Sequence, residues 1–141
     1  MKILLDTNII IDCLTKRMPH FEFSKDVLRE CLGGKAIACM ATHTANDIFY
    51  IAHKTKPDVP VSELVEAIVA FTQILETIDL TAADIKAAAS LGFADFEDAL
   101  ISQCAFKANV DFIITRNCKD FAKSIVEAIE PQSFLERVNA I

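Results

Sequence analysis

Short apolar runs alternate along this chain with longer segments whose apolar residues recur every three or four positions. Residues 2–5, 36–41, 76–80, 111–115 and 126–129 are predicted to form strands, and the fully apolar run 36–41 suits a buried parallel strand. The spaced segments predict helices at residues 8–14, 22–32, 44–54, 62–75, 81–91 and 96–108, and a last helix that begins at Pro131. Strands that alternate with helices predict a parallel sheet covered on both faces, the three-layer α/β/α class.

Capping signals mark the starts of several expected helices. Ser62 precedes one apolar repeat and is expected to cap it, and Thr81 with Asp84 has the spacing of a capping box. Thr42 and Thr44 are hydroxyl candidates for capping the helix that ends near residue 54.

Length and composition indicate one globular domain. The 141 residues lie close to the roughly 150 that one domain usually takes, so we expect a single domain over residues 1–141. The chain is 52% apolar and 24% charged, which excludes a disordered chain. Its longest apolar run, residues 36–41, is far below the ~18 residues of a membrane span, and its start lacks the shape of a signal peptide. We therefore expect a cytoplasmic protein with no membrane partner.

Charge and cysteine usage narrow the possible functions. Fourteen Lys and Arg against 20 Asp and Glu give a formal charge of −6, which argues against a protein that coats nucleic acid through net charge alone. Nucleic acid could still be handled through bound metal ions and a local basic rim. The five cysteines are odd in number and form no C-x-x-C pair, so we expect buried thiols rather than disulfides or a zinc site.

Polar side chains gather where predicted strands end or the next helices begin. In open parallel sheets, binding sites lie beyond the carboxyl ends of the strands, so these side chains are candidates for one shared site. Four places supply them: Asp6, Thr7 and Asn8; Asn46 and Asp47; Asp95, Glu97 and Asp98; and Thr115, Arg116 and Asn117.

The acids in this set suggest a cation. Asp95 and Asp98 are three residues apart and are expected on one helix face, with Glu97 turned away. Converging Asp6, Asp47 and Asp98 would repel one another without a positive charge, and a hard divalent ion such as Mg²⁺ or Mn²⁺ is the simplest compensation. Such an ion activates water and stabilises charge on a scissile phosphate, which lets a nuclease work without a nucleophilic side chain.

Each acid taken alone also has a structural explanation. Asp6 could cap the following helix, Asp95 and Asp98 could suit a helix dipole, and Asp47 could be solvated. The coincidence of the four places carries the metal hypothesis. Surface or capping roles are expected for the three histidines, His20, His43 and His53.

Two segments resemble motifs of a known family. The opening ILLDTNIIIDCL resembles the first motif of the PIN domain family, an apolar strand that ends in Asp followed by Thr and Asn, with Asp12 on the helix. The segment DFEDALISQCAFKANVDFIITRNCKDF is similar to the last motif, an acid-bearing helix and a strand leading to Thr-Arg-Asn or Thr-Arg-Asp. Within the family, the chain resembles the VapC-like ribonuclease toxins of prokaryotic toxin-antitoxin pairs over nearly its whole length.

The resemblance implies roles for individual residues. It implies Asp6 and Asp98 as principal metal ligands, Asp95 as a neighbouring acid and Asp47 as a further catalytic and metal-binding acid. Supporting hydrogen bonds to ligands or water are implied for Thr7, Asn8 and Thr115, with Asn117 and Asp120 beside them. The family usually has Glu at the position of Asp47 and often Asp at that of Asn117. Asp120 is the candidate to replace the missing charge.

The resemblance also implies an activity and partners. The leading hypothesis is a Mg²⁺- or Mn²⁺-dependent endoribonuclease that hydrolyses RNA phosphodiester bonds, inhibited by a small antitoxin and forming a homodimer. Phosphate contacts are expected from crevice-edge cations, chiefly Arg116, Lys16 and Lys54, with Arg17, Lys56 and Lys119 as further candidates.

Two alternatives remain open. The first is a catalytically weakened PIN-fold module that binds RNA or protein, because Asp47 and Asn117 depart from the family pattern. The second is a phosphotransfer or dehalogenase-like enzyme with Asp6 as nucleophile. This second reading is disfavoured because Asn8 stands where that chemistry needs another acid.

Overall fold

Five parallel strands form one sheet in residues 1–140, the part of the chain that the computed structural model describes. They lie in the order β3 (Glu76–Ile78), β2 (Ile37–Ala41), β1 (Lys2–Leu5), β4 (Phe112–Ile114) and β5 (Ala128–Ile129). In the central strand, Leu4 pairs with Cys39 on one side and Ile113 on the other. The predicted parallel sheet is confirmed, although most of the strands are shorter than the sequence indicated.

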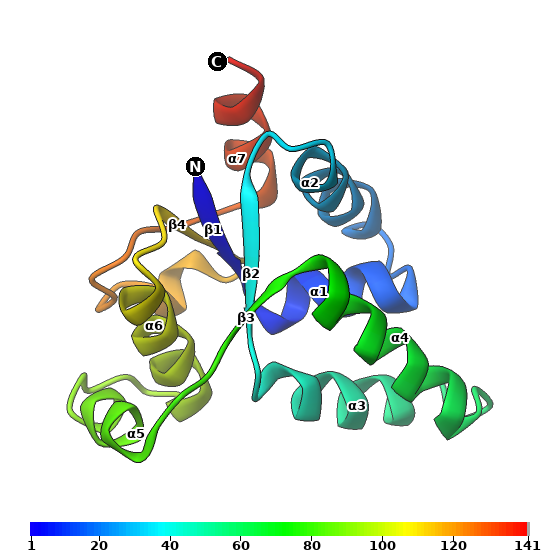
Figure 1. The fold of residues 1–141 in the computed structure, drawn as a ribbon, viewed down its shortest axis with the longest axis horizontal. Helices are drawn as coiled ribbons and strands as arrows, with labels where there is room; N and C mark the ends of the chain where they lie inside the picture. The colour runs from blue at the N-terminus through cyan, green and yellow to red at the C-terminus, as the bar shows by residue number, and fades with distance from the viewer. Residues whose placement is uncertain (141) are drawn as a thin grey trace.

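Within residues 1–140, seven α-helices cover both faces of this sheet, which gives the three-layer α/β/α fold (Figure 1). One core cluster joins the sheet to the helices on the first face: α1 (Thr7–Thr15), α2 (Phe21–Leu32), α3 (Thr44–Thr55), α4 (Val61–Ile74) and α7 (Pro131–Asn139). A second cluster joins the other face to α6 (Phe96–Ala108), against which α5 (Ala82–Ala89) packs. A short 3₁₀ helix, η1 (Cys118–Phe121), was not predicted.

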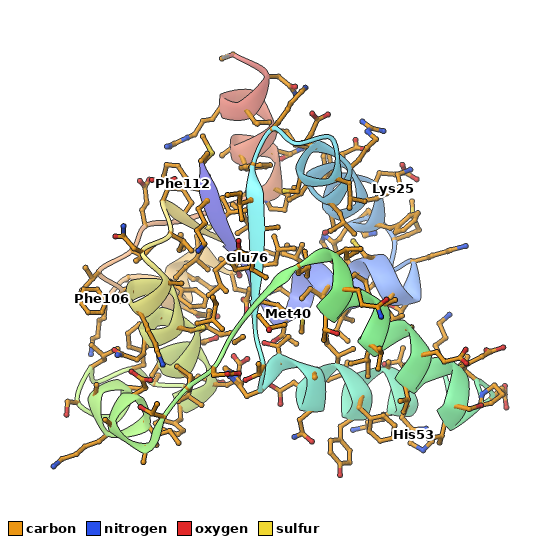
Figure 2. All side chains as sticks on the ribbon, in the orientation of Figure 1. Lys25, Met40, His53, Glu76, Phe106 and Phe112 are labelled. Carbon is orange, nitrogen blue, oxygen red and sulfur yellow. The ribbon has the colours of Figure 1, made fainter. Side chains whose placement is uncertain are left out.

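The two core clusters follow from the alternation of side chains along the strands. Ile3 and Leu5 of β1 belong to the cluster under α1–α4, whereas Leu4 belongs to the cluster under α6. Met40 of β2 lies inside the first cluster, while His53 and Phe106 lie at the periphery of the molecule (Figure 2). Burial on both faces explains why β2 and β4 read as continuous apolar runs.

Two of the predicted helix caps are wrong and one is confirmed. The N-cap of α4 is Pro60, which leads into the helix with an extended ψ of 143°, so Ser62 already lies inside the helix. At α3 the N-cap position is His43, whose side chain makes no capping hydrogen bond, and neither neighbouring threonine replaces it. Thr81 and Asp84 form the full capping box of α5.

The cysteines are free thiols, as their odd number and spacing predicted. All five cysteines are free, and Cys39 and Cys104 are fully buried. Burial raises the pKa of Cys104 to about 12, so its thiol stays protonated at neutral pH. Cys13, Cys31 and Cys118 are half-buried.

Within residues 1–140, no helix is both long enough and apolar enough to cross a membrane.

The strand order places a crevice beside the central strand. From β1 the chain moves to β2 and then β3 on one side, and later returns to β4 and β5 on the other. The order reverses at β1, so the loops that leave the carboxyl ends of β1 and β4 diverge and leave a crevice between them. This crevice holds most of the polar residues that the sequence singled out.

Candidate metal centre

Asp6 lies at the carboxyl end of β1, where it both caps α1 and faces the crevice. Its Oδ1 accepts the backbone N–H of Thr7 at 2.8 Å, so the capping role is confirmed. Its Oδ2 accepts the hydroxyl of Thr115 at 2.7 Å and the side-chain amide of Asn8 at 3.1 Å. The side chain is therefore held by three donors, and only 4% of the residue is exposed. Asp6 therefore caps α1 with one carboxylate oxygen and still lines the crevice.

A hydrogen bond between the side chains of Asn8 and Thr115, at 3.3 Å, joins the start of α1 to the end of β4. Besides donating to Asp6, the Thr115 oxygen accepts the backbone N–H of Asn117 at 3.1 Å. The side-chain oxygen of Asn8 accepts the backbone N–H of Arg116 at 3.4 Å. These contacts hold Thr115 and Asn8 against the Asp6 carboxylate.

The start of α6 brings three acids to the same crevice. Asp95 is the N-cap, and its Oδ1 accepts the backbone N–H groups of Glu97 and Asp98 at 2.8 and 3.3 Å. Asp95 has extended backbone dihedrals and precedes the helix, so the expectation that it shares a helix face with Asp98 does not apply. Its carboxylate instead turns back onto the start of the helix. Asp98 is a full helical residue in the first turn.

Glu97 was predicted to turn away, and this prediction is wrong. Its Oε1 accepts the hydroxyl of Thr7 at 3.0 Å, and its carboxylate lies in the site. The long side chain in the first turn of α6 reaches back over the start of α1, which a helix-face argument ignores. The sequence did contain a signal, because three acids within four residues at a helix start offer more charge than one cap needs.

Carboxylate oxygens of Asp6, Glu97 and Asp98 all lie within 4.8 Å of one another. They face a cavity of about 340 Å³ at the carboxyl ends of the strands. The other residues that line this cavity are Thr7, Asn8, Ile11, Arg17, Asp47, Ile51, Asp95 and Asn117. The structure therefore brings together most of the acids that the sequence placed in one crevice, and adds Glu97 to them.

Burial and repulsion from neighbouring carboxylates raise the pKa values of Asp6 and Asp98. Burial raises the pKa of Asp6 to about 6, although the hydrogen bond from Thr115 opposes the shift. The pKa of Asp98 rises to about 7, through burial first and then through the charges of Asp6, Asp95 and Glu97. A site that disfavours its own negative charges in this way favours a bound cation.

Asp47 enters the cavity from the first turn of α3. Burial, followed by the charge of Glu97, raises its pKa. Its Oδ2 is shielded from solvent and has no hydrogen-bond partner among residues 1–140. An unsatisfied carboxylate oxygen beside three further carboxylates is a donor set that fits a hard divalent cation.

The cationic residues are distributed unevenly around the cavity. Arg17 lines it, whereas Lys16 and Lys54 are exposed and lie outside the lining. Arg116 directs its guanidinium toward Asp12 rather than into the cavity. Asp120 is also exposed outside the lining, although its charge contributes to the raised pKa of Asp98.

Comparison with known families identifies the class. Residues 2–119 match the PIN domain family model, and this match includes the first motif, the last motif as far as Lys119 and all the acids that line the cavity. The chain therefore belongs to the PIN domain family.

Individual relatives agree with this class. The chain is 26% identical to Ribonuclease VapC1 of Aquifex aeolicus, with 99% of this chain and 97% of that protein covered. A crystal structure of VapBC2 from Rickettsia felis bound to a promoter DNA fragment superposes with a TM-score of 0.70 at 19% identity, covering 92% of this chain and 98% of the other. Mycobacterium tuberculosis VapC20, described as a Sarcin-Ricin loop cleaving toxin, superposes with a TM-score of 0.63 at 13% identity, covering 79% and 86%.

Proposed function

We propose that this protein is a divalent-metal-dependent endoribonuclease of the VapC type, the toxin of a toxin-antitoxin pair. The observation that carries the proposal is the convergence of the Asp6, Glu97 and Asp98 carboxylates at the switch point of the sheet. Similarity to Ribonuclease VapC1 over nearly the full length of both proteins supports the same reaction class.

Different residues of the site would bind the metal ion and orient its ligands. Asp6, Glu97 and Asp98 would hold a Mg²⁺ or Mn²⁺ ion, with Asp47 as a further oxygen donor at the edge. When bound, the ion supplies neutralising charge and Lewis acidity toward the phosphodiester and the attacking water. Thr115, Asn8 and the Thr7 N–H keep the Asp6 carboxylate in one orientation, so little rearrangement is needed on metal binding.

RNA is the proposed substrate because of what the relatives are described to act on. One is named a ribonuclease and another a Sarcin-Ricin loop cleaving toxin. Arg17 at the cavity is the cation placed to meet a phosphate. Because the chain carries a net charge of −6, RNA binding should depend on few phosphate contacts and show a modest salt dependence.

An antitoxin and a second copy of the chain are the proposed partners. The superposed VapBC structures are toxin-antitoxin assemblies, which supports a small antitoxin whose inserted segment covers the cavity. Ile11 and Ile51 line the cavity beside the acids, so that segment would combine apolar and cationic side chains. The proposed compartment is the cytoplasm, where RNA and antitoxin are both available.

Cleavage of a mixed RNA pool with Mg²⁺, Mn²⁺ or EDTA tests the activity. We expect cleavage by the wild type with either metal, none with EDTA, and a loss of about 100-fold or more in Asp98→Asn. Asp58→Asn is the matched control because Asp58 is an exposed loop acid. Equal cleavage by Asp98→Asn and wild type would show that this site is not the catalytic one.

The partners are tested separately from the reaction. Light scattering on the isolated chain should give twice the mass of 15.6 kDa if it forms a homodimer. Coexpression with the product of the adjacent reading frame should yield a stable complex without RNA cleavage. Binding of RNA without cleavage in either metal would instead support the alternative of a catalytically weakened module.

A further inference from the structure

A second group of potential metal ligands lies beside the acids already described. His43 and Asp47 come from the start of α3, and Glu97 comes from the start of α6. One ligand atom from each of these residues lies within 4.8 Å of the other two. Glu97 belongs to this group and also to the group formed with Asp6 and Asp98. The two groups therefore adjoin through a single carboxylate.

Three polar atoms of this group are unsatisfied. Both ring nitrogens of His43 and Oδ2 of Asp47 are shielded from solvent and lack a hydrogen-bond partner within residues 1–140. A buried polar atom without a partner costs about 1–3 kcal/mol, and native proteins contain few of them. Unsatisfied atoms on two neighbouring side chains that each bring a ligand atom to the same small space indicate that a bound group satisfies at least one atom of each.

An ion pair between His43 and Glu97 does not account for these atoms. Nε2 of His43 lies 3.6 Å from Oε1 of Glu97, which is beyond a good hydrogen bond. Such a pair would also leave Oδ2 of Asp47 without a partner. His43 does not cap α3 either, although it occupies the N-cap position.

A metal ion would take one ring nitrogen of His43 and one oxygen of Asp47 as ligands at the same time. Ligands at about 2.1 Å from one ion lie roughly 3.0–4.2 Å apart, so separations of up to 4.8 Å need only a small closure of the side chains. One imidazole with two carboxylates is a mixed nitrogen and oxygen donor set. Such a set suits first-row transition ions, whereas Mg²⁺ prefers oxygen ligands alone.

We propose that His43, Asp47 and Glu97 form a second cation site that takes a transition-metal ion through an imidazole nitrogen, with Glu97 shared between it and the Asp6–Asp98 site. The inference rests on the proposed function, because it adds a second ion to the proposed nuclease centre. His43 thereby determines the metal specificity of this site.

Manganese itself is the probe for this site. Tag-free, full-length protein is loaded with one and then two equivalents of Mn²⁺, and pulsed EPR is used to detect coupling to a ligand ¹⁴N nucleus. We expect ¹⁴N coupling in the wild type that His43→Gln abolishes and Asp98→Asn retains. His53→Gln, which alters an exposed histidine of the same helix, is the matched control and should keep the coupling.

Calorimetry supplies an independent readout. His43→Gln should weaken one class of Mn²⁺ site by about tenfold or more and leave the Mg²⁺ affinity within a factor of about two. A wild type that binds Mn²⁺ without ¹⁴N coupling, or a variant with unchanged Mn²⁺ affinity, overturns the inference. Cleavage that needs Asp98 but shows no nitrogen ligand overturns this inference alone. Nitrogen coupling in a protein that does not cleave RNA supports the site and contradicts the proposed function.

Discussion

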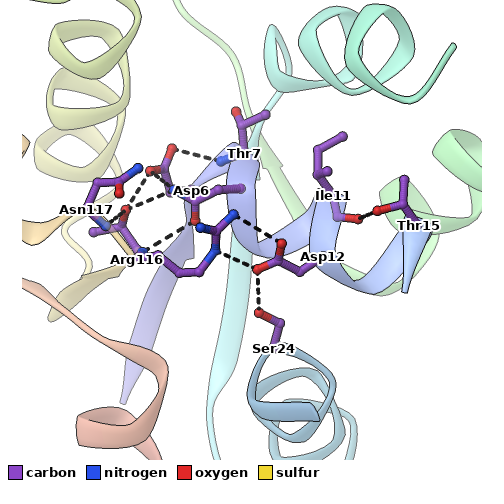
Figure 3. A network of polar contacts seen from close by, with 10 residues as sticks. Asp6, Thr7, Ile11, Asp12, Thr15, Ser24, Arg116 and Asn117 are labelled. Atoms are coloured by element: carbon purple, nitrogen blue, oxygen red, sulfur yellow. Dashed lines mark hydrogen bonds and ion pairs between the residues drawn. The ribbon is translucent and has the colours of Figure 1, made fainter. Parts of the chain in front are cut away.

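Arg116 and Asp12 form a bidentate ion pair outside the lining of the cavity (Figure 3). Nε of Arg116 lies 2.8 Å from Oδ2 of Asp12, and Nη2 lies 3.2 Å from Oδ1. Asp12 is completely buried and also accepts the hydroxyl of Ser24 from α2 at 3.1 Å. The pair ties the loop after β4 to α1 and α2. Arg116, predicted from sequence to contact RNA, is thus engaged in the interior of the fold.

Breaking this pair from one side should destabilise the protein strongly. Arg116→Met leaves the Asp12 carboxylate buried and unpaired, so we expect a loss of about 3 kcal/mol in the free energy of unfolding. The double variant Asp12→Leu with Arg116→Met should recover most of that loss. Denaturant unfolding measures both. Arg29→Met, which breaks an exposed pair with Asp26, should change stability by less than about 1 kcal/mol.

The double variant also tests the RNA-binding prediction for Arg116. If it folds and its KM for RNA matches the wild type, Arg116 acts only through the structure. A raised KM in the folded double variant would instead show that Arg116 contacts the substrate.

Glu97→Gln should abolish most of the activity, although the sequence argument placed this residue outside the site. The change removes a carboxylate from both groups of ligands, so we expect RNA cleavage to fall about 100-fold. In the metal-free protein the pKa of Asp98 should fall below about 7, because the charge of Glu97 contributes to raising it. Cleavage assays and NMR titration measure these effects. Glu66→Gln, an exposed substitution on α4, should leave both unchanged.

Thr115→Val should weaken metal binding without disturbing the shape of the site. The buried hydroxyl donates to Asp6 and lowers its pKa, so its loss should raise the pKa of Asp6 further above about 6. We expect the Mn²⁺ affinity to fall about tenfold and the stability to fall by about 1 kcal/mol. Calorimetry and denaturant unfolding are the measurements. An unchanged affinity would contradict the supporting role, and Thr72→Val at an exposed hydroxyl is the control.

The metal-free protein should lose stability as the pH rises from about 5 to 8. The pKa values of Asp6 and Asp98 are raised to about 6 and about 7, so both acids keep protons in the folded state that the unfolded chain has already lost. Their contribution is therefore complete below about pH 4 and disappears as the pH rises through the folded values. The lowered pKa of Asp84 acts in the opposite sense, but only below about pH 4.

Thermal unfolding in EDTA measures this dependence. Asp98 is half-exposed, so solvent screening limits its effect, and we expect Asp98→Asn to raise the Tm by about 3 °C at pH 8 and little at pH 5. Saturating Mn²⁺ should reverse the trend in the wild type, because the ion binds the charged carboxylates. A metal-free Tm that rises between pH 5 and 8 would contradict the repulsion inferred among these acids.

The fold could be predicted from the sequence because each element carries its own local signal. Apolar runs such as residues 36–41 and the exact bounds of the helix at residues 96–108 follow from burial and helical periodicity. Helix starts were less predictable. Pro60 and His43 stand at N-cap positions without a capping side chain, since tertiary packing and the preceding loop decide where those helices begin.

The candidate site was predictable in part for the same reason. Strand ends and motif residues placed Asp6, Asp98 and Thr115 at one edge of the sheet, and there they meet. The roles of Glu97 and Arg116 were not predictable, because each depends on a partner that lies far away in sequence. Thr7 is 90 residues from Glu97, and Asp12 is 104 residues from Arg116.

What the amino-acid sequence determined by itself is the order of strands and helices, and therefore the edge of the sheet at which the acids gather. Parallel strands have all their carboxyl ends on one side, so that outcome needs no knowledge of side-chain positions. The tertiary structure alone decided which long side chains reach the crevice. It turned Glu97 inward to Thr7 and drew Arg116 down to the buried charge of Asp12, because unsatisfied hydrogen bonds and unpaired buried charges are costly and the nearest partners lie on other elements.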